Sequence, residues 1–595
     1  MQRRQNRIGR WLAPTLALGL MAALAPARAQ VTKPAVGNPA NNPLDPSPFG
    51  VNFLKWEFLK GHADVWTDLR QRMALMKAAR IYWDRDGIDK NTVNPKPGVW
   101  DWDFTDKVVA LAKEQHIHLA VILMGGPPPR DAAGRASYAE YVYQTVHRYQ
   151  GSVKVWEIWN EPNIPSFWEN PDVRLYTLML KDAYAAAKRA DPACVVLGGS
   201  ANGPGNDWFN GIADEGGWAS CDAISLHPYA MSPDPIRQRL DLILHIINRV
   251  VAAHGPKPVW ITEDGWRAER TPAEEANQAV QVFQTYVIAL ANGVHNLDYF
   301  CMDDYDHWGL IHSSQPFDPK PSYTAVQTLT RALGAPGPAA PFAGYLKMPT
   351  GSAGFVFRKP GYRRTLILWN NDEQARTLTL PQRAGLTAMD ILGHPVAVTQ
   401  GRLTLGETPI IVSGADVRRL GPVSPAFDPF TLPPGTNLLY NGALDAAPDT
   451  TSGTWKTPGN WYPGVFNAGG KDADLRVTGG GRHASTCLSI SKATGVAAWN
   501  NAIIPVEPGH RYKLTAWIKT QAATGKNTAQ IVWYSGNMWT PMGTVDTPPQ
   551  AGTQDWTEVT AEGVCPRDAM FVRVHLRSEN NTGTVLYDDV ALTEE

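Results

Sequence analysis

Residues 155–163 read V-W-E-I-W-N-E-P-N, an apolar strand pattern that carries two acids, Glu157 and Glu161, among tryptophans. An apolar run of this length that ends at Asn and Pro predicts a buried strand followed by a loop. Burying a carboxylate at a strand end is costly unless the group is paired or used. Glu161, just past the strand, is therefore a candidate functional group.

The same pattern repeats on either side of this segment, from Phe49 to about Leu333. Short apolar runs alternate with helical stretches, two of which begin with clear signals: Asn170-Pro171 and the capping box Thr271-Pro272-Ala273-Glu274. The predicted strands are G-V-N-F (50–53), A-R-I-Y-W (79–83), L-A-V-I-L-M (119–124), V-K-V-W-E-I-W (153–159), V-V-L-G-G (195–199), A-I-S-L-H (223–227), P-V-W-I-T-E (258–263) and L-D-Y-F-C-M (297–302).

Eight strands with helices between most of them predict an α/β fold, a (β/α)8 TIM barrel over residues 49–335. An open doubly wound sheet is the alternative, and it fits less well because no glycine-rich nucleotide loop follows the first strand. After Ala335-Pro336-Gly337-Pro338 the helical periodicity stops. We expect an accessory β-domain at 340–420, a linker at 421–436 and a C-terminal β-sandwich of jelly-roll type at 437–595.

The bulk composition excludes some classes of function. The 595-residue chain has a formal net charge of -1 and 43% hydrophobic residues, so it is globular and has no basic surface for nucleic acid. Most of the 22 tryptophans are expected in the core. Because indole rings also stack on sugars, their number favours a carbohydrate partner as well.

The N-terminus is typical of a secretory signal peptide at residues 1–29. Arginines precede an apolar run from Trp11 to Leu24, and Ala27-Arg28-Ala29 supplies a cleavage site, with a linker at 30–48 behind it. We therefore expect a secreted or periplasmic protein with no membrane span after signal removal. A retained anchor is the alternative. Nothing in the sequence predicts the oligomeric state.

Export permits disulfides, and the chain has 5 cysteines. Cys194 could pair with Cys221, and Cys487 with Cys565, which would leave Cys301 as a buried thiol. No cysteine or histidine spacing predicts a zinc site.

Glu161 has a counterpart about a hundred residues later. Residues 258–266 read P-V-W-I-T-E-D-G-W, so Glu263 ends the seventh strand as Glu161 ends the fourth. Barrel active sites form at the carboxyl ends of the strands, where these two groups can converge on one bond. Two such carboxylates, one protonated and one ionised, are what glycoside hydrolysis requires. As ordinary rim residues they would instead form salt bridges.

The segments W-N-E-P-N (159–163) and I-T-E (261–263) resemble those of clan A glycoside hydrolases. The resemblance implies that Glu161 is the acid/base and Glu263 the nucleophile of a retaining enzyme, with Asn160 bonding the sugar 2-hydroxyl. Asp264 follows Glu263 directly, where the clan more often has an aromatic residue. Strand alternation lets only one of the two face the barrel, and we expect Glu263. Glu157 should lie deeper and be structural.

The same resemblance suggests further substrate-binding residues. His227 and Tyr229 in S-L-H-P-Y would contact the substrate or the nucleophile, and Arg80 on the second strand would hold the nucleophile ionised. Trp308 would form the floor of the central subsite. Each also has a structural interpretation: a satisfied core histidine, an ion pair or a packed ring.

Within the clan, the sequence resembles glycoside hydrolase family 39 in particular. The shared segments are G-V-W-D-W-D (98–103), W-G-L-I (308–311) and F-D-P-K-P-S-Y (317–323), together with the β-domain that follows the barrel. The resemblance covers roughly residues 49–420. It implies a β-glycosidase or endoglycosidase acting on a poly- or oligosaccharide, without a catalytic cofactor. A carbohydrate-binding matrix protein on an inactive barrel and a transglycosylase are the alternatives.

The C-terminal region resembles carbohydrate-binding modules of the family 4/9 type, on N-L-L-Y-N-G-A-L-D (437–445) and V-L-Y-D-D-V-A-L (585–592). In these modules the first and last strands lie together and can hold a structural calcium, for which Asp445 and Asp588 are the candidates. Several aromatic residues either stack on sugar or fill the core: Trp461, Tyr462, Trp499, Trp533 and Trp539.

Overall fold

The computed structural model describes most of the chain from residue 47 onward. The described ranges are 47–52, 56, 60–229, 240–313, 317–335, 339–358, 364–371, 375–380, 386–414, 421–427, 429–430, 435–439, 442–444, 448–449, 457–458, 461–465, 473–483, 485–501, 503–536 and 540–595. The predicted signal peptide and nearly all of the linker at 30–48 lie outside these ranges. Within them, no helix is long and apolar enough to cross a membrane.

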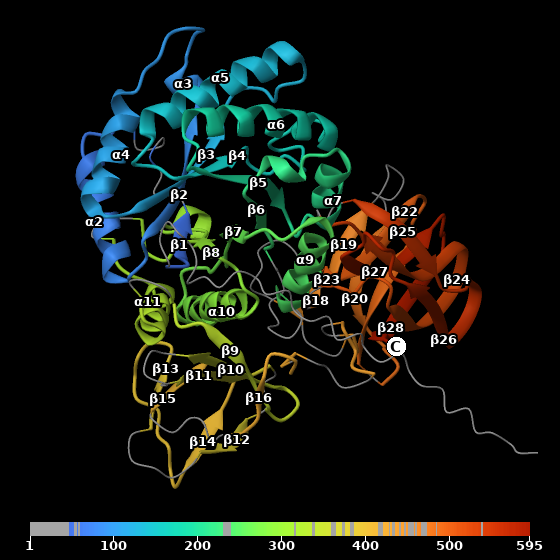
Figure 1. Cartoon of the computed structure of the whole chain (residues 1–595). Coiled ribbons are helices and arrows are strands. Elements are labelled where there is room, and N and C mark those ends of the chain that lie inside the picture. The colour runs from blue at the N-terminus through green and yellow to red at the C-terminus, as the bar shows by residue number, and fades with distance from the viewer. Residues whose placement is uncertain are drawn as a thin grey trace, which may run out of the picture. The chain divides into compact units, whose positions relative to one another are not determined.

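Eight parallel strands close into a barrel, which confirms the predicted fold (Figure 1). They are β1 (Phe49–Asn52), β2 (Trp83–Asp89), β3 (His118–Met124), β4 (Val155–Ile158), β5 (Val195–Asn202), β6 (Ala223–His227), β7 (Val259–Asp264) and β8 (Asn296–Tyr299). Closure comes from β1 against β8, where Gly50 pairs with Asp298. A β-carbon on Gly50 would lie 1.8 Å from Asp298 Oδ1, so only glycine fits at this seam.

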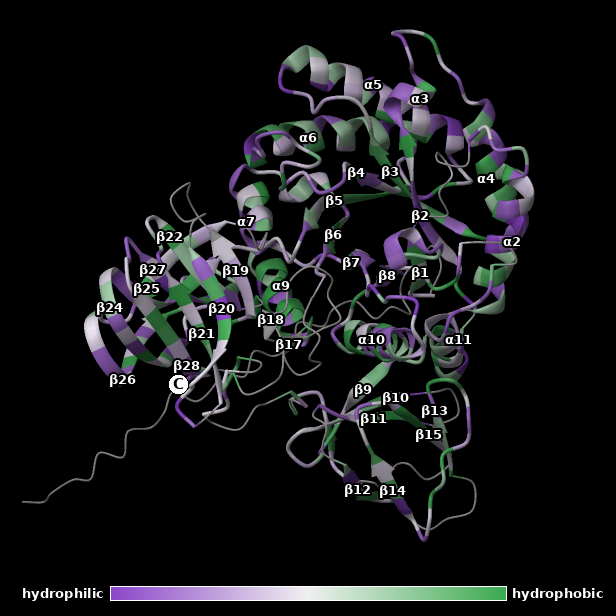
Figure 2. Ribbon diagram, turned by 180° about the vertical axis from the view of Figure 1, so that it is seen from behind, coloured by the Kyte–Doolittle hydropathy of each residue, from purple (hydrophilic) through white to green (hydrophobic). Residues whose placement is uncertain are grey.

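Helices surround the barrel, and Figure 2 shows both hydrophilic and hydrophobic residues along them, as expected for helices with one buried face. The main ones are α2 (Val65–Ala78), α4 (Asp103–Gln115), α5 (Ala132–Tyr149), α6 (Val173–Ala190), α7 (Asn206–Asp214), α9 (Leu240–His254), α10 (Pro272–Ala291) and α11 (Pro321–Leu333). Short helical turns lie at α3 (Lys90–Val93), η2 (Trp218–Ser220) and η3 (Tyr305–His307).

The helix starts test the two capping predictions. Thr271 caps α10 as expected, because its side chain accepts a hydrogen bond from the Glu274 amide. The start at Asn170-Pro171 was wrong by two residues: α6 is capped by Asp172, whose carboxylate accepts from the Leu175 amide. The start is shifted because Asp is as good an N-cap as Asn, and here Asp172 takes that position.

The accessory domain is a six-stranded antiparallel sheet and a two-stranded one, with an apolar core of its own. In sheet order the strands are β13 (Thr387–Asp390), β15 (Ile410–Gly414), β11 (Arg364–Asn370), β10 (Ser352–Arg358), β9 (Phe342–Leu346) and β16 (Val423–Ser424), followed by the pair β12 (Arg376–Thr379) and β14 (Arg402–Leu405). Because β16 pairs with β9, this domain extends into the expected linker at 421–436.

The C-terminal region folds as an antiparallel β-sandwich, as expected. Its strands are β17 (Pro448–Asp449), β18 (Thr457–Pro458), β19 (Trp461–Val465), β20 (Asp474–Gly479), β21 (Thr486–Ser491), β22 (Val496–Asn501), β23 (Ile504–Pro505), β24 (Arg511–Tyr534), β25 (Pro541–Asp546), β26 (Gln550–Val564), β27 (Phe571–Glu579) and β28 (Thr584–Glu594). The first half of β24 pairs mainly with β26 and β28, and its second half with β25 and β27. This one long strand therefore links these strands into a single hydrogen-bonded sheet.

Most of the aromatic residues proposed for sugar stacking in the sandwich are core residues. Trp461, Trp499 and Trp533 are buried, whereas the Tyr462 ring is 49% exposed. Trp539 lies outside the described residues. The stacking interpretation is therefore wrong for the three buried tryptophans and stays a prediction for Tyr462.

Asp588, one of the two residues predicted to bind calcium, already accepts hydrogen bonds from the protein. Asp588 is buried, and its two oxygens accept from the amides of Arg482 and Asp589. Asp445 lies outside the described residues. Among the residues that are described, no group of three acidic, histidine or cysteine ligands forms around Asp588. Structural calcium remains a prediction that these residues do not strengthen.

All five cysteines are described, buried and free, so neither proposed disulfide forms. Burial raises the pKa of Cys194, Cys221 and Cys487 to about 11 and that of Cys565 to about 12, which keeps these thiols protonated. They act as small apolar side chains in the cores.

Candidate active site

Glu161 stands just beyond β4, in a turn where its own amide donates to the Ser200 carbonyl at 2.8 Å. Its side chain is almost buried. Oε1 accepts from Asn202 Nδ2 and contacts His227 Nδ1, each at 2.9 Å. Among the described residues both side-chain hydrogen bonds of Glu161 end on Oε1, which leaves Oε2 for a substrate.

Glu263 lies next to the end of β7 with 14% of its side chain exposed. Oε1 accepts from Arg85 Nη1 at 2.6 Å, and Oε2 accepts from the Tyr229 hydroxyl at 2.8 Å. A charge-assisted bond to an arginine favours the ionised carboxylate. Glu263 is therefore held as an anion with a fixed orientation, which is the state a nucleophile needs.

The two carboxylates converge as strand positions four and seven predict. One oxygen of Glu161, one oxygen of Glu263 and a ring nitrogen of His227 all lie within 4.8 Å of one another. A retaining glycosidase needs carboxyl groups about 5–5.5 Å apart, and an inverting one about 6.5–9.5 Å. The contact distance fits the first arrangement, in which no water stands between the acid and the nucleophile.

The same three side chains could in principle ligate a metal ion, since carboxylates and imidazole are common ligands. Here Glu161 Oε1 and both oxygens of Glu263 already have side-chain hydrogen-bond partners. The positive guanidinium of Arg85 lies 2.6 Å from Glu263 Oε1. A second cation at this position would be repelled by the first. The donor set fits acid–base chemistry better than metal binding.

Arg80 does not reach the site, and its assignment was wrong. It lies in the turn after α2, before β2 begins at Trp83, and its Nη1 donates to the Ala335 carbonyl at 2.6 Å. Arg85, inside β2, takes the expected place. The sequence pattern misplaced the strand because W-D-R-D-G-I-D is too polar to resemble a buried strand, whereas A-R-I-Y-W does.

The remaining predicted residues do gather around the carboxylates. Asn160 Oδ1 accepts from Arg85 Nη2 at 2.8 Å, and His227 and Tyr229 contact Glu161 and Glu263 as described. Trp308 is half-buried and its ring packs edge-on against Tyr229, with 5.7 Å between ring centroids. Asn202 and Thr262 also belong to this group; neither was predicted, although both lie at polar ends of apolar strands.

The protonation of the site follows from these contacts. Burial alone would raise the pKa of Glu161, but His227, Asn202 and Arg85 together lower it below its ordinary value. Burial and the charge of Glu263 raise the pKa of Tyr229 well above 10, so its phenol stays neutral and donates. The charges of Glu157 and Glu263 outweigh burial at Arg85 and raise its pKa, which keeps it a cation.

Glu263 bonds Arg85 and Tyr229, and Asp264 shares neither hydrogen bond. Asp264 is buried, and its Oδ1 accepts from the Gly265 amide at 3.0 Å. Burial raises its pKa to about 7 from an ordinary 3.8, with small opposing contributions from the Gly265 amide and His227.

The raised pKa of Asp264 predicts a pH-dependent stability. The folded state binds this proton more tightly than the unfolded state, so the stability it supports is present below about pH 4 and is lost as the pH rises toward 7. Asp264→Asn keeps the acceptor without the charge. We expect its free energy of unfolding, measured in urea, to exceed that of the wild type by about 2–4 kcal/mol at pH 8. At pH 4 the two free energies should be nearly equal. Equal stabilities at both pH values would contradict this expectation.

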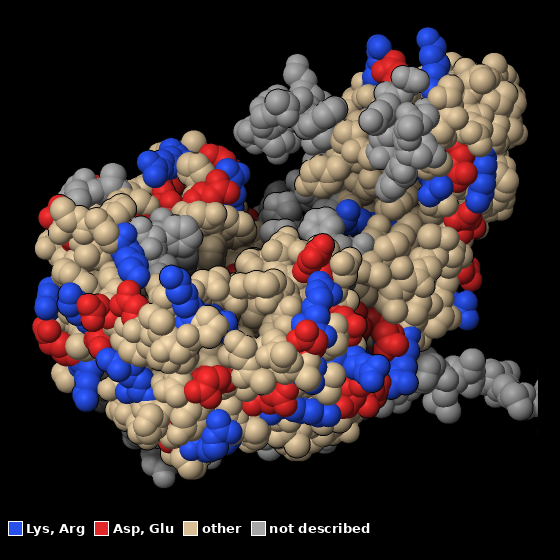
Figure 3. All heavy atoms as spheres, turned by 90° about the horizontal axis from the view of Figure 1, so that it is seen from above, with Lys and Arg blue, Asp and Glu red and all other residues tan. Residues whose placement is uncertain are grey.

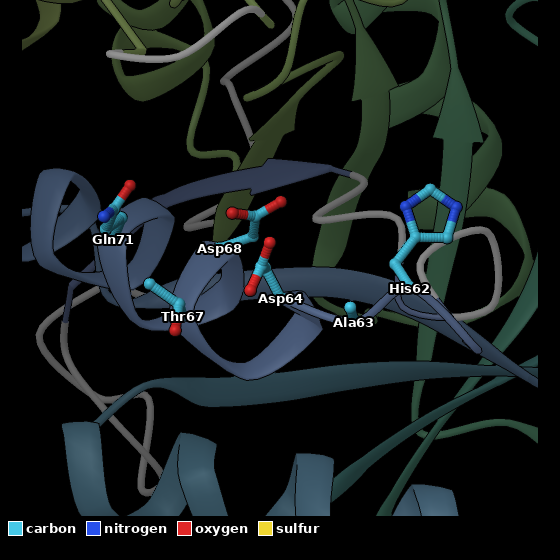
Figure 4. Close-up of a pocket in the computed structure, with 6 residues that line it drawn as sticks. All are labelled: His62, Ala63, Asp64, Thr67, Asp68 and Gln71. Atoms are coloured by element: carbon cyan, nitrogen blue, oxygen red, sulfur yellow. The ribbon is translucent and has the colours of Figure 1, made fainter.

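The described surface on the face that Figure 3 shows adds no second charged site. On the face that Figure 3 shows, lysines and arginines are interspersed with acids, and its described part has no extended patch of one sign. A shallow depression opens beside the start of α2, lined by His62, Ala63, Asp64, Thr67, Asp68 and Gln71 (Figure 4). None of the side chains around Glu161 and Glu263 lines it.

No protein-family profile matches this sequence. No curated protein matches it either. Solved structures do. A family 39 glycoside hydrolase from the gut symbiont Bacteroides cellulosilyticus WH2 superposes with a TM-score of 0.53 at 20% identity, over 62% of this chain and 81% of that one.

Two further structures match less well. A family 39 β-xylosidase from Caulobacter crescentus has a TM-score of 0.44 at 14% identity, over 62% of this chain and 95% of that one. The catalytic domain of family 30 xylanase C from Talaromyces cellulolyticus has 0.45 at 13%, over 62% and 96%. At these identities the likeness is one of fold: the chain has a barrel structurally similar to that of a family 39 glycoside hydrolase.

Proposed function

We propose that this protein is a retaining glycoside hydrolase that cleaves a poly- or oligosaccharide, with Glu263 as nucleophile and Glu161 as acid/base. The observation that carries the proposal is the pairing of two nearly buried carboxylates at the ends of β4 and β7, one held ionised by Arg85 and the other with a free oxygen. The motifs shared with family 39 and the similar barrel of a family 39 enzyme support it.

In the first step, Glu263 attacks the anomeric carbon while Glu161 gives its proton from Oε2 to the departing glycosidic oxygen. The Tyr229 hydroxyl and Arg85 would hold Glu263 in line for attack. A covalent glycosyl-enzyme results. In the second step, Glu161 takes a proton from water, which attacks the same carbon and restores the configuration.

The side chains around the pair suggest how sugar is held. Asn160 Oδ1 is occupied by Arg85, so its Nδ2 group is directed by that bond and can donate to the sugar 2-hydroxyl. The half-buried Trp308 offers a ring for stacking. We propose further that the protein is secreted or periplasmic, where polymeric glycans occur, and that the sandwich binds the same polymer.

The test is sugar release and product stereochemistry. The purified protein is incubated with plant, cellular and exopolysaccharide glycans, reducing ends are measured, and proton NMR follows the first anomer formed. Release with initial retention is expected. Release with inversion would refute the assigned mechanism. No release from any glycan, together with retained binding, would favour a binding protein on an inactive barrel.

Transglycosylation is the rival within the same chemistry, because a second sugar can replace water in the second step. An added acceptor sugar would separate the two: elongated products at the expense of reducing ends would identify a transglycosylase.

A further inference from the structure

A chain of fully buried side chains lies behind the two carboxylates. Arg85 Nε donates to Glu157 Oε2 at 2.5 Å, and the Thr262 hydroxyl donates to Glu157 Oε1 at 2.9 Å. Thr262 Oγ1 also lies 3.1 Å from His227 Nε2. His227 in turn contacts Glu161, so Glu157 is linked to the acid/base through Thr262 and His227.

The donors and acceptors of this chain fix where one proton sits. Glu157 lies against the Arg85 guanidinium and is therefore an anion that can only accept. Thr262 has one hydroxyl proton, and the stronger charge-assisted bond directs it to Glu157. Its oxygen is then free only to accept, which favours a proton on His227 Nε2, whereas Arg85 Nη2, a donor 3.3 Å away, competes for the same nitrogen. With that proton on Nε2, one further proton is shared between His227 Nδ1 and Glu161 Oε1.

The charges around His227 decide which partner keeps that shared proton. Arg85 on β2 opposes a positive ring, with Nη2 at 3.3 Å from Nε2. Three carboxylates favour it: Glu157 on β4 through Thr262, Glu161 at 2.9 Å, and Glu263 on β7, whose Oε2 is 3.8 Å from Nδ1.

The other titratable groups nearby do not change this balance. Tyr229 after β6 is neutral, as described above. Burial raises the pKa of Asp298 on β8 well above its ordinary value, which favours the uncharged form of this carboxyl. Asp264 on β7 is buried, and what charge it carries above pH 7 would also favour a protonated ring.

We propose that Glu157 and Thr262 are positioning residues that keep His227 protonated and thereby keep Glu161 ionised in the free enzyme. This inference rests on the proposed function and assigns a role to Glu157, for which a merely structural one was expected. The ionised form of Glu161 is the base of the second step. These hydrogen bonds therefore favour the second step and disfavour the first, in which Glu161 must be protonated. The lowered pKa of Glu161, to which His227 contributes, agrees with it.

Thr262→Val is the sharpest test, because valine has the same shape and lacks the hydroxyl, and Thr262→Ser is the matched control that restores it. kcat/KM requires a protonated Glu161, so its basic limb reports the ionisation of Glu161 in the free enzyme. We expect this limb to move to higher pH by about one unit in Thr262→Val, and to stay at the wild-type position in Thr262→Ser.

A general loss of structure would not produce that pattern. It would lower kcat/KM at all pH values and leave the limb in place. Thermal unfolding of both variants should be compared first to show that each is folded. A Thr262→Val limb at the wild-type pH, or a limb that moves equally in Thr262→Ser, would overturn the proposal.

A measurement independent of catalysis separates this proposal from the proposed function. The ring nitrogens of 15N-histidine-labelled protein are titrated by NMR, and His227 is identified by the signal that His227→Asn removes. We expect both nitrogens to stay protonated to higher pH in wild type and Thr262→Ser than in Thr262→Val. Identical titrations would refute the role of Thr262 even if hydrolysis is observed, and the expected difference would stand even if no substrate is found.

Discussion

Glu263→Ala protein is expected to release no measurable reducing sugar from a glycan that the wild-type protein hydrolyses. The substitution removes the carboxylate that Arg85 and Tyr229 hold and that attacks the anomeric carbon in the proposed mechanism. A positioned group of this kind has an effective concentration of about 10⁵ M or more, so the rate should fall by about 10⁵-fold. The assay is initial-rate release of reducing ends under identical conditions for both proteins.

The fold should survive this substitution, which makes the loss interpretable. Arg85 keeps its bonds to Glu157, Asn160 and Asn52 when Glu263 is removed, so its charge remains paired. Circular dichroism should show an unchanged spectrum. Glu114→Ala is the matched control: this glutamate is 55% exposed at the end of α4, which leads into the opposite end of the barrel.

Adding azide to the Glu263→Ala protein should give a new product, which is a positive result in addition to the loss of activity. Azide can enter the space that the Glu263 side chain leaves and attack the anomeric carbon of an activated aryl glycoside directly. The product should then be a glycosyl azide of inverted configuration. Full activity in Glu263→Ala would mean that another carboxylate is the nucleophile, and Asp264 would be the next candidate to substitute.

The barrel could be predicted from the sequence because seven of its strands are apolar enough to be recognised. The two catalytic candidates came from strand order alone: the carboxyl ends of strands four and seven face one another across a barrel, whatever the loops do. His227 and Tyr229 came from resemblance, and in the structure they contact Glu161 and Glu263 respectively.

The second strand shows where such prediction fails. Residues 83–89 include three acids and an arginine, and yet Asp84, Arg85 and Asp86 are buried. Both acids accept hydrogen bonds from Trp56, and Arg85 pairs with Glu157 and Glu263 on other strands. Apolar patterning cannot identify a strand whose buried side chains are charged. The same reasoning explains why Arg80, next to an apolar run, was chosen over Arg85.

The hydrogen bonds that join Thr262 to His227 and Asn202 to Glu161 could not be predicted from the sequence for a related reason. Thr262 and Asn202 come from different strands, and only the closed barrel brings them to His227 and Glu161. Nothing in the local sequence distinguishes such a threonine from any β-branched strand residue. The two disulfide predictions fail for a different reason: cysteines near consecutive strands need not face one another, and here all five are buried and free.

Glu161→Ala is expected to reveal its role through its dependence on the leaving group. A positioned general acid contributes about 10²–10⁴-fold, so hydrolysis of a natural glycoside, whose departing alkoxide needs a proton, should fall by that factor. A dinitrophenyl glycoside leaves without protonation, so its first step should be nearly unaffected. The glycosyl-enzyme should then accumulate, because the second step still needs the base, and KM should fall with kcat.

Azide completes the argument, because its product distinguishes Glu161 from Glu263. It needs no base, so it should restore turnover of the dinitrophenyl glycoside by Glu161→Ala and yield a glycosyl azide of retained configuration, through the intermediate on Glu263. An inverted azide, or equal losses on both substrates, would contradict the assignment. His227 and Asn202 both bond Oε1 and would lose that partner together, so Glu161→Gln, which keeps an oxygen there, is the control for their displacement.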